Sequence, residues 1–259
     1  MVKIIIVGAS SGIGMKVAEA FASRGIKVGL AARHTTNLKK LKEQYPDNVE
    51  YTSIDVTHVN APKLLNELIE KTGGMDIYFH VAGIGYDNPE LDPQREAEII
   101  NTNAVGFARM IASAYNYFKA SGRPGRIAAV TSVAGTNGIG KLSAYSASKR
   151  CAQTYLVALE QLAHNQGVNV KFTDIRPGWI RTPLLKSDRS YPLEMTLDQA
   201  VPLIIKAIVR HPRVAYIDWR WSLVTALWKS IPNAVWTRMS LPMSSPRSNK
   251  SAAKTHATP

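Results

Sequence analysis

The feature that most constrains the fold is a repeated alternation between short, continuous apolar runs and longer amphipathic segments. The apolar runs have the length of buried strands, and the longer segments have helical periodicity. Strands separated by helices predict a parallel sheet covered on both faces, joined by right-handed crossovers. We therefore expect an α/β, doubly wound sheet of about seven strands in a single domain over residues 1–240. The predicted strands are 3–8, 27–32, 49–54, 75–81, 125–131, 168–175 and 214–217, and the predicted helices lie near 13–24, 37–45, 61–71, 95–120, 143–166 and 196–210.

The first predicted strand leads directly into the glycine-rich turn GASSGIG. Such a turn between a strand and a helix lets the backbone approach a pyrophosphate, which the free N–H groups and the helix dipole attract. The alternative is a turn that serves the fold alone, since glycine patterns also occur by chance. The candidate dinucleotide-binding residues of this turn are Gly8, Ser10, Ser11, Gly12, Ile13 and Gly14.

The end of the second predicted strand indicates which dinucleotide is preferred. An Asp or Glu at this point would bind the ribose 2′-hydroxyl of NAD, but the chain has Ala31, Ala32 and Arg33, and the next acid is Glu43. The guanidinium of Arg33 can instead pair with a 2′-phosphate. We expect NADP(H) to be preferred, with NAD(H) as the secondary cofactor. The alternative for Arg33 is a solvated surface side chain.

Two Tyr-x-x-x-Lys pairs occur, at Tyr115–Lys119 and Tyr145–Lys149. With ten tyrosines and seventeen lysines in 259 residues, about 0.7 such matches are expected by chance, so the spacing alone says little. Tyr145 and Lys149 follow the carboxyl end of the fifth predicted strand, where ligands bind in folds of this kind. Tyr115 and Lys119 lie toward the opposite edge of the sheet, and we interpret them as a surface pair.

With these features in place, the chain resembles the short-chain dehydrogenase/reductase family, in its single-domain branch of about 250 residues, over most of residues 1–220. Its Rossmann-type fold is the one expected above. The matching positions, in chain order, are Gly8, Gly12, Gly14, Asp55, Val56, Ala82, Gly83, Asn103, Ser132, Tyr145, Lys149, Pro177, Gly178, Thr182 and Pro183.

The resemblance implies a catalytic tetrad of Asn103, Ser132, Tyr145 and Lys149. Tyr145 would be the general acid in carbonyl reduction and the base in alcohol oxidation. The positive charges of Lys149 and of an oxidised nicotinamide would lower its pKa from about 10. Ser132 would hydrogen-bond the substrate oxygen, Lys149 would also hold the nicotinamide ribose, and Asn103 would position a water that links Lys149 to solvent.

The resemblance also implies further cofactor contacts. Asp55 would accept from the adenine amino group beside the Val56 backbone, and Ile180 and Thr182 would contact the carboxamide. Tyr145, Lys149, Ala82, Gly83, Pro177 and Gly178 complete the candidate cofactor-binding residues. Simpler alternatives stay open: Ser132 as a strand-end hydroxyl, Asn103 as a packing amide, and Asp55 as a turn or capping residue.

Two departures from the family pattern affect residues beside the site. Val7 stands where Thr usually precedes the first glycine, and His80-Val81-Ala82-Gly83 replaces Asn-Asn-Ala-Gly. His80 must therefore tie adjacent strands by another bond or not at all. A role for His80 as a second catalytic acid is the remote alternative.

Composition excludes several other classes. The single cysteine, Cys151, excludes an internal disulfide framework, and we interpret it as a small buried residue; no metal site is expected. The net charge of +13 is dispersed, without the basic and aromatic groove that nucleic-acid binding requires. The first apolar run is too short for a signal peptide and no segment is long enough to span a membrane, so a cytoplasmic protein is expected.

The last third of the chain carries the features that would select a substrate. Residues 184–200 fall where the family has its variable substrate loop, and residues 241–259 are expected to form a disordered basic tail. Four of the five tryptophans lie in the segment 219–239, where a helix would gather Leu223, Val224, Leu227, Trp228 and Ile231 on one face. That helix would be a lid or a subunit interface or, as the less favoured alternative, a contact with an anionic membrane surface.

The combined interpretation is an NADP(H)-preferring oxidoreductase that interconverts a carbonyl and a secondary alcohol, on a small-molecule substrate that is partly apolar. A homo-dimer or homo-tetramer is expected from the family resemblance. The rival hypothesis is a non-catalytic dinucleotide-binding sensor or scaffold on the same fold.

Overall fold

A computed structural model describes residues 2–182, 185, 188–241 and 244–246 of the chain. Seven parallel strands form one sheet in the order β3-β2-β1-β4-β5-β6-β8. The strands of this sheet are β1 (Lys3–Val7), β2 (Lys27–Ala32), β3 (Val49–Ser53), β4 (Ile77–His80), β5 (Gly125–Val130), β6 (Val170–Pro177) and β8 (Val214–Ile217). The chain winds outward from β1 in both directions, which confirms the doubly wound fold expected from the sequence.

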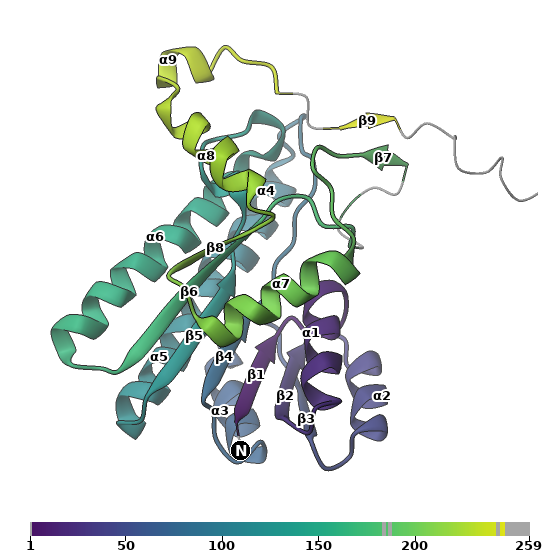
Figure 1. The fold of residues 1–259 in the computed structure, drawn as a ribbon, viewed down its shortest axis with the longest axis vertical. Coiled ribbons are helices and arrows are strands. Elements are labelled where there is room, and N and C mark those ends of the chain that lie inside the picture. The colour runs from purple at the N-terminus through teal and green to yellow at the C-terminus, as the bar shows by residue number, and fades with distance from the viewer. Residues whose placement is uncertain (1, 183–184, 186–187, 242–243, 247–259) are drawn as a thin grey trace, which may run out of the picture.

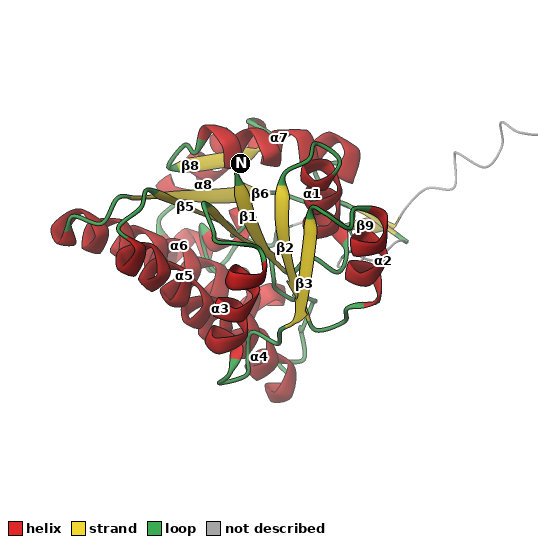
Figure 2. Ribbon diagram, turned by 90° about the horizontal axis from the view of Figure 1, so that it is seen from below, coloured by secondary structure: helices red, strands yellow, loops and turns green. Residues whose placement is uncertain are grey.

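Helices cover both faces of the sheet (Figures 1 and 2). On one face α1 (Gly12–Ala22), α2 (Thr36–Gln44) and α7 (Leu197–Arg210) pack against Ile4 and Ile6 of β1. On the other face α3 (Ala61–Lys71), α5 (Phe107–Ser121) and α6 (Ser143–Gln166) pack against Ile5 and Val7. Alternate residues of a strand face opposite sides of the sheet, so burial on both sides explains the continuous apolar runs.

The predicted helix over 95–120 is three consecutive segments rather than one regular helix. The α-helix α4 (Pro93–Ile100) passes into a π-helix, η1 (Asn101–Gly106), which passes into α5. The prediction of a single α-helix was therefore wrong in its middle. A π-segment widens the helix by one residue per turn, and such segments are often found at functional sites.

The carboxyl-terminal segment folds back over the edge to which the strands point. Two short helices, α8 (Arg220–Ser230) and α9 (Asn233–Trp236), lie at this end of the molecule (Figure 1). Two 3₁₀ turns, η2 (Val133–Gly135) and η3 (Gly140–Leu142), precede α6.

The predicted tail, 241–259, contains one described strand. Strand β9 (Ser245–Pro246) pairs antiparallel with β7 (Arg189–Ser190), which lies in the predicted substrate loop. Arg189 also donates a hydrogen bond of 3.0 Å to Ser244. Residues 242–243 and 247–259 of the tail, 184, 186 and 187 of the loop, and Pro183 of the family pattern lie outside the described residues.

Candidate active site

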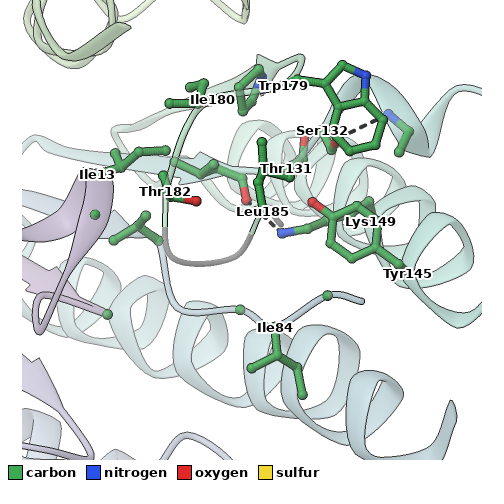
Figure 3. A pocket seen from close by; sticks show the side chains of 18 of the residues that line it. Ile13, Ile84, Thr131, Ser132, Tyr145, Lys149, Trp179, Ile180, Thr182 and Leu185 are labelled. Carbon is green, nitrogen blue, oxygen red and sulfur yellow. Dashed lines mark hydrogen bonds between the residues drawn. The ribbon is translucent and has the colours of Figure 1, made fainter. Parts of the chain in front are cut away.

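A cleft of about 1020 Å³ runs along the carboxyl ends of the strands. Its walls come from the ends of β1, β2, β4, β5 and β6, from the loop after β6, and from α8. Of the candidate site residues, all but Gly14 and Asn103 line it. Figure 3 shows Ser132, Tyr145 and Lys149 gathered on one side, with Trp179 above them and Ile13 across the cleft.

The turn after β1 requires glycine because the backbone passes so close to the neighbouring strand end. Gly8 has φ +97°, and a Cβ added to it would lie 2.4 Å from the Ala82 nitrogen. A Cβ on Gly14 would lie 2.2 Å from the Gly8 carbonyl oxygen, so Gly14 acts in packing behind the turn rather than as a cleft residue. Among the described residues no side chain caps the amino end of α1, so its N–H groups remain available for an anion.

Arg33, Asp55 and Val56 form the far end of the cleft, at the ends of β2 and β3. Asp55 Oδ1 accepts hydrogen bonds from the Thr57 backbone N–H (2.9 Å) and hydroxyl (2.7 Å). Burial alone would raise the pKa of the Asp55 carboxyl, but these bonds and the charge of Arg33 hold it below its ordinary value. Asp55 therefore makes the turn that was its alternative role, while its carboxylate also faces the cleft.

Tyr145 and Lys149 lie one turn apart on α6, and the Lys149 ammonium is 5.6 Å from the centre of the Tyr145 ring. Lys149 Nζ donates to the Val130 carbonyl (3.2 Å), which fixes the ammonium at the end of β5. The Ser132 hydroxyl hydrogen-bonds Tyr145 and accepts from the Ala134 N–H (3.1 Å). Ser132, Tyr145 and Lys149 are up to seventeen residues apart in the sequence. Their side chains nevertheless lie together at one point of the cleft.

The ionisation of this cluster differs from the expectation. Burial raises the pKa of Tyr145 above its ordinary value, and the hydrogen bond with Ser132 only partly opposes this. Burial also lowers the pKa of Lys149 to about 8, against a smaller raising effect of Asp174. Lys149 is therefore only partly charged at slightly alkaline pH, and the protein groups alone do not lower the tyrosine pKa as predicted. The contribution of an oxidised nicotinamide stays a prediction.

Asn103 lies beneath the cleft rather than on its wall. Its side chain, 2% exposed, accepts from the Ile84 N–H (2.9 Å) and donates to the Ile84 carbonyl (2.7 Å) and the Ser148 hydroxyl (3.2 Å). It projects from the π-helix η1 and ties the loop that follows β4 to α6. A Cβ on Gly83 would lie 3.1 Å from Asn103 Oδ1 and 3.4 Å from Lys149 Nζ, so both polar groups flank this glycine.

His80 does not tie strands together through its ring. It is fully buried, its Nδ1 lies 3.0 Å from the Tyr78 hydroxyl on the same strand, and Phe107 packs edge-on against it. Burial, with the charge of Lys149, lowers the pKa of His80 to about 3. His80 is therefore a neutral packing residue that does not line the cleft, and the catalytic-acid alternative finds no geometric support.

The second Tyr–Lys pair and the cysteine also require correction. Tyr115 is not a surface residue: it is 3% exposed, and its hydroxyl donates to Gln166 Oε1 (3.0 Å). It packs in the core between the sheet and α5, away from the cleft. Cys151 is exposed rather than buried, because it faces away from the sheet on α6.

Several residues that support the site were not identified by the sequence analysis. Gln153 Nε2 donates to the Ser132 carbonyl (2.8 Å), and its place one turn beyond Lys149 was a signal that could have identified it. Thr131 donates to Asp174, which also pairs with Arg176 (2.6 Å) beneath the cluster. No pattern in the sequence indicated this buried ion pair.

A glycine also faces the tyrosine ring. A Cβ on Gly85 would lie 2.6 Å from Tyr145 Cδ2, so only glycine lets the loop after β4 pass the ring at this distance. Tyr145 also packs against an apolar cluster that Trp179 joins, and the Trp179 ring centre lies 4.7 Å from that of Tyr191. The ring is thus held between a backbone segment and an apolar cluster.

The loop after β6 and α8 form the remaining wall. Pro177, Gly178, Ile180 and Thr182 line the cleft, and a Cβ on Gly178 would clash with the indole of Trp221 at 1.9 Å. The expected single apolar face of the 219–239 helix is wrong: Val224 and Trp228 line the cleft, whereas Leu223 and Leu227 are exposed. Beyond the tyrosine hydroxyl the wall is mainly apolar, from Ile139, Leu142, Trp179, Leu185, Trp221, Val224, Trp228 and Leu241.

Comparisons with known proteins agree with this geometry. A family model described as short chain dehydrogenase matches residues 2–192. An uncharacterized oxidoreductase of Myxococcus xanthus is 30% identical over 236 residues, covering 88% of this chain and 92% of that protein. One of Mycobacterium tuberculosis is 32% identical over 238 residues, covering 87% and 92%.

Solved structures share the fold at lower identity. A short chain dehydrogenase from Burkholderia cenocepacia in complex with NADP has a TM-score of 0.78 at 20% identity, covering 93% of this chain and 98% of that one. A short-chain dehydrogenase from Sphingobium yanoikuyae in complex with NADPH has a TM-score of 0.74 at 23% identity, covering 90% and 98%.

Proposed function

This chain belongs to the short-chain dehydrogenase family of oxidoreductases, and from that premise we propose that it interconverts a carbonyl and a secondary alcohol with NADP(H) as the preferred cofactor. The observation that carries the proposal is the meeting of Ser132, Tyr145 and Lys149 on the wall of a cleft that begins at an uncapped helix terminus. We assign carbonyl reduction as the direction in cells.

The residues present fit a nicotinamide dinucleotide. The backbone at Gly8 leaves no room for a side chain, and the free N–H groups of α1 would hold the pyrophosphate. Arg33, which follows β2 where an acid would bind a 2′-hydroxyl, would pair with the 2′-phosphate, and Asp55 and Val56 would hold the adenine. Lys149 would hold the nicotinamide ribose. When bound, the nicotinamide supplies or accepts the hydride.

Proton transfer is then assigned to the protein. Tyr145 donates its hydroxyl proton to the substrate oxygen in reduction and accepts one in oxidation. Ser132, held by Gln153 and Ala134, hydrogen-bonds the same oxygen as negative charge develops there. Lys149, with a pKa of about 8, stabilises the phenolate when charged and can return a proton to it. Asn103 keeps the loop at Ile84 fixed beside this proton path.

The wall beyond Tyr145 favours a substrate with a bulky apolar body. Trp179, Trp221 and Trp228 line this part of the cleft, and burial of apolar area would supply most of the binding energy. A small, highly polar carbonyl compound would leave this surface uncovered.

The test is an NADPH-oxidation assay over a panel of ketones and aldehydes that spans size and polarity. We expect turnover with large apolar ketones, and a loss of at least about 10²-fold in kcat for Tyr145→Phe without loss of NADPH binding. Tyr115→Phe, which removes the hydroxyl of the other Tyr–Lys pair, is the matched control and should turn over normally.

Two outcomes would contradict the proposal. Undiminished turnover by Tyr145→Phe would remove Tyr145 from the chemistry. Tight NADPH binding without oxidation on any member of the panel would favour the rival, a dinucleotide-binding sensor or scaffold.

A further inference from the structure

Helix α8 carries a row of exposed apolar side chains on its outer side. Trp219, immediately before the helix, is 69% exposed, Leu223 is 62% exposed and Leu227 is 65% exposed. Residues four apart lie above one another on a helix, so these three form one continuous row, which we call the α8 ridge. No other part of the described chain exposes a tryptophan to this extent.

The ridge is part of a local concentration of apolar surface. Of the fourteen large hydrophobic side chains that the described residues expose, five lie within the 21 residues 219–239. The two outside the ridge are Val235 (52%) and Met239 (43%) on and after α9. Scattered exposed hydrophobic residues need no explanation, but adjacent side chains such as those of the ridge mark an interaction surface.

The ridge faces outward because the inner side of α8 is firmly packed. Trp221 and Thr225 are buried, and Trp228 stacks edge-on between Trp221 and Trp236. Asn137 Nδ2 donates to the Trp228 carbonyl (3.0 Å), and Trp236 Nε1 donates to the Gly138 carbonyl (2.7 Å). Rotation of the helix to bury the ridge would break this packing, so the ridge stays at the surface unless something else covers it.

The charges around the ridge indicate what covers it. Residues 211–241 contain four Lys or Arg residues and one Asp. The acid, Asp218, is 7% exposed and is paired with the Arg220 guanidinium (2.8 Å). Lys229 and Arg238, in the same segment, are exposed. The exposed, unpaired charges of this segment are therefore cationic and accompany an apolar row, as on helices that lie in the interface of an anionic bilayer.

We propose that the α8 ridge docks this protein on the surface of a membrane that contains anionic lipid. Two copies of this face would bring Lys229 and Arg238 together without an exposed acid on the segment to pair with them, which disfavours a symmetric dimer here. Lipid phosphates would pair with these two cations. The indole of Trp219 is amphipathic, like the side chains that lie at the level of lipid headgroups.

The contact is peripheral. None of the helices in the described residues is long and apolar enough to cross a bilayer. Because Val224 and Trp228 on the inner side of α8 line the cleft, docking places one wall of the cleft next to the lipid. The proposal does not depend on the proposed chemistry, and Tyr145→Phe should bind vesicles as the unaltered protein does.

The experiment is co-sedimentation of the full chain with vesicles of phosphatidylcholine containing about 30% phosphatidylglycerol, and with pure phosphatidylcholine. We expect at least about tenfold stronger binding to the anionic vesicles, weakened when salt is raised from about 0.1 M to 0.5 M. The triple variant Trp219→Ser, Leu223→Ser, Leu227→Ser should lose at least about tenfold in binding. Its circular dichroism spectrum and its thermal unfolding check that it folds.

The matched control replaces the same number of exposed apolar side chains elsewhere, as Val59→Ser, Leu91→Ser and Val209→Ser, which are 74%, 57% and 51% exposed. It should bind vesicles normally, and Lys229→Gln with Arg238→Gln should reduce only the preference for anionic lipid. Absent binding by the unaltered protein, or equal binding by the ridge variant, would overturn the proposal. A change of oligomeric state in the ridge variant, measured by light scattering, would also overturn it, because a second copy would then cover the ridge.

Discussion

The position of the Tyr145 hydroxyl depends on the absence of a side chain at Gly85. An added Cβ would lie 2.6 Å from Tyr145 Cδ2, while Trp179 and Leu142 pack around the ring in the same cluster. We predict that Gly85→Ala moves the ring and lowers kcat by about 10²-fold, since displacement of a catalytic group by about 1 Å has effects of that size. Steady-state kinetics with the best substrate of the panel would measure this loss.

Gly138→Ala is the control for this substitution. A Cβ on Gly138 meets no atom within 4 Å, so the same change of residue should leave kcat within about twofold. NADPH affinity should be unchanged in both variants. Equal kinetics for the two would show that the ring tolerates the displacement.

The burial of Lys149 lowers the free energy of unfolding of the protein, by an amount that depends on pH. Its pKa is about 8 in the folded protein against 10.5 ordinarily, because burial disfavours the ammonium. Between these values the unfolded chain binds more protons than the folded one, so this group makes the free energy of unfolding rise with pH. The destabilisation is fully present below pH 8 and amounts to about 3 kcal/mol, which disappears by pH 10.5.

We therefore predict a pH-dependent difference between the unaltered protein and Lys149→Met. Relative to the variant, the unaltered protein should gain about 3 kcal/mol between pH 8 and pH 10.5, as measured by urea unfolding. A difference that is constant with pH would mean that Lys149 titrates normally.

At the scale of elements, α6 begins where it does because a side chain from α4 caps it. Glu96 Oε2 accepts from the Ser143 hydroxyl (2.9 Å) and the Ala144 N–H (3.0 Å), and Glu96 Oε1 accepts from Asn88 (2.8 Å). The bond from Asn88, followed by those from Ser143 and Ala144, lowers the pKa of Glu96 although burial opposes them. The amino end of the helix that bears Tyr145 is thereby fixed.

We predict that Glu96→Gln lowers the free energy of unfolding by about 1 kcal/mol at pH 7, the usual effect of losing a cap. Because the folded pKa is depressed, the advantage of Glu96 is present above its ordinary value of 4.5 and is lost as pH falls through the folded value. Urea unfolding of both proteins should therefore converge at acidic pH. Glu90→Gln, which removes a charge from an exposed position, should show no such loss at pH 7.

The elements that the sequence predicted correctly are those whose pattern is local. All seven strands were expected near their observed positions, because burial on both faces leaves a continuous apolar run. The π-segment at Asn103 was not predicted, since a widened turn has the same composition as a regular one. The two faces of α8 were not separated, because both are apolar and only tertiary contacts decide which one is buried.

At the scale of the whole molecule, most of the candidate site was predictable because a parallel sheet brings its strand ends to one edge. Ser132, Arg33 and Asp55 each follow a strand, so their common edge follows from topology alone. The substrate side was not predictable, since its wall joins the loop after β6 to α8 and to Leu241. Such contacts between distant segments leave no periodic signal in the chain.

The cleft also crosses most of the sheet, from Asp55 after β3 to Thr182 after β6, so a dinucleotide bound along it should stabilise the whole molecule. A ligand present at about 100 times its Kd adds about 2.7 kcal/mol, which for a domain of this size raises Tm by roughly 5 to 10 °C. At equal concentrations we predict a larger rise with NADPH than with NADH, because only NADPH has a 2′-phosphate to pair with Arg33.

Arg33→Ala tests this assignment through the difference between the two cofactors. In the variant the NADPH shift should fall to the size of the NADH shift, and the NADH shift should be unchanged, since the adenine, pyrophosphate and nicotinamide contacts are unaltered. Arg24→Ala removes the same charge from an exposed position outside the cleft, and its two shifts should match those of the unaltered protein. If Arg33→Ala reduced both shifts equally, Arg33 would act on a part common to both cofactors, and the preference for NADP(H) would lose its physical basis.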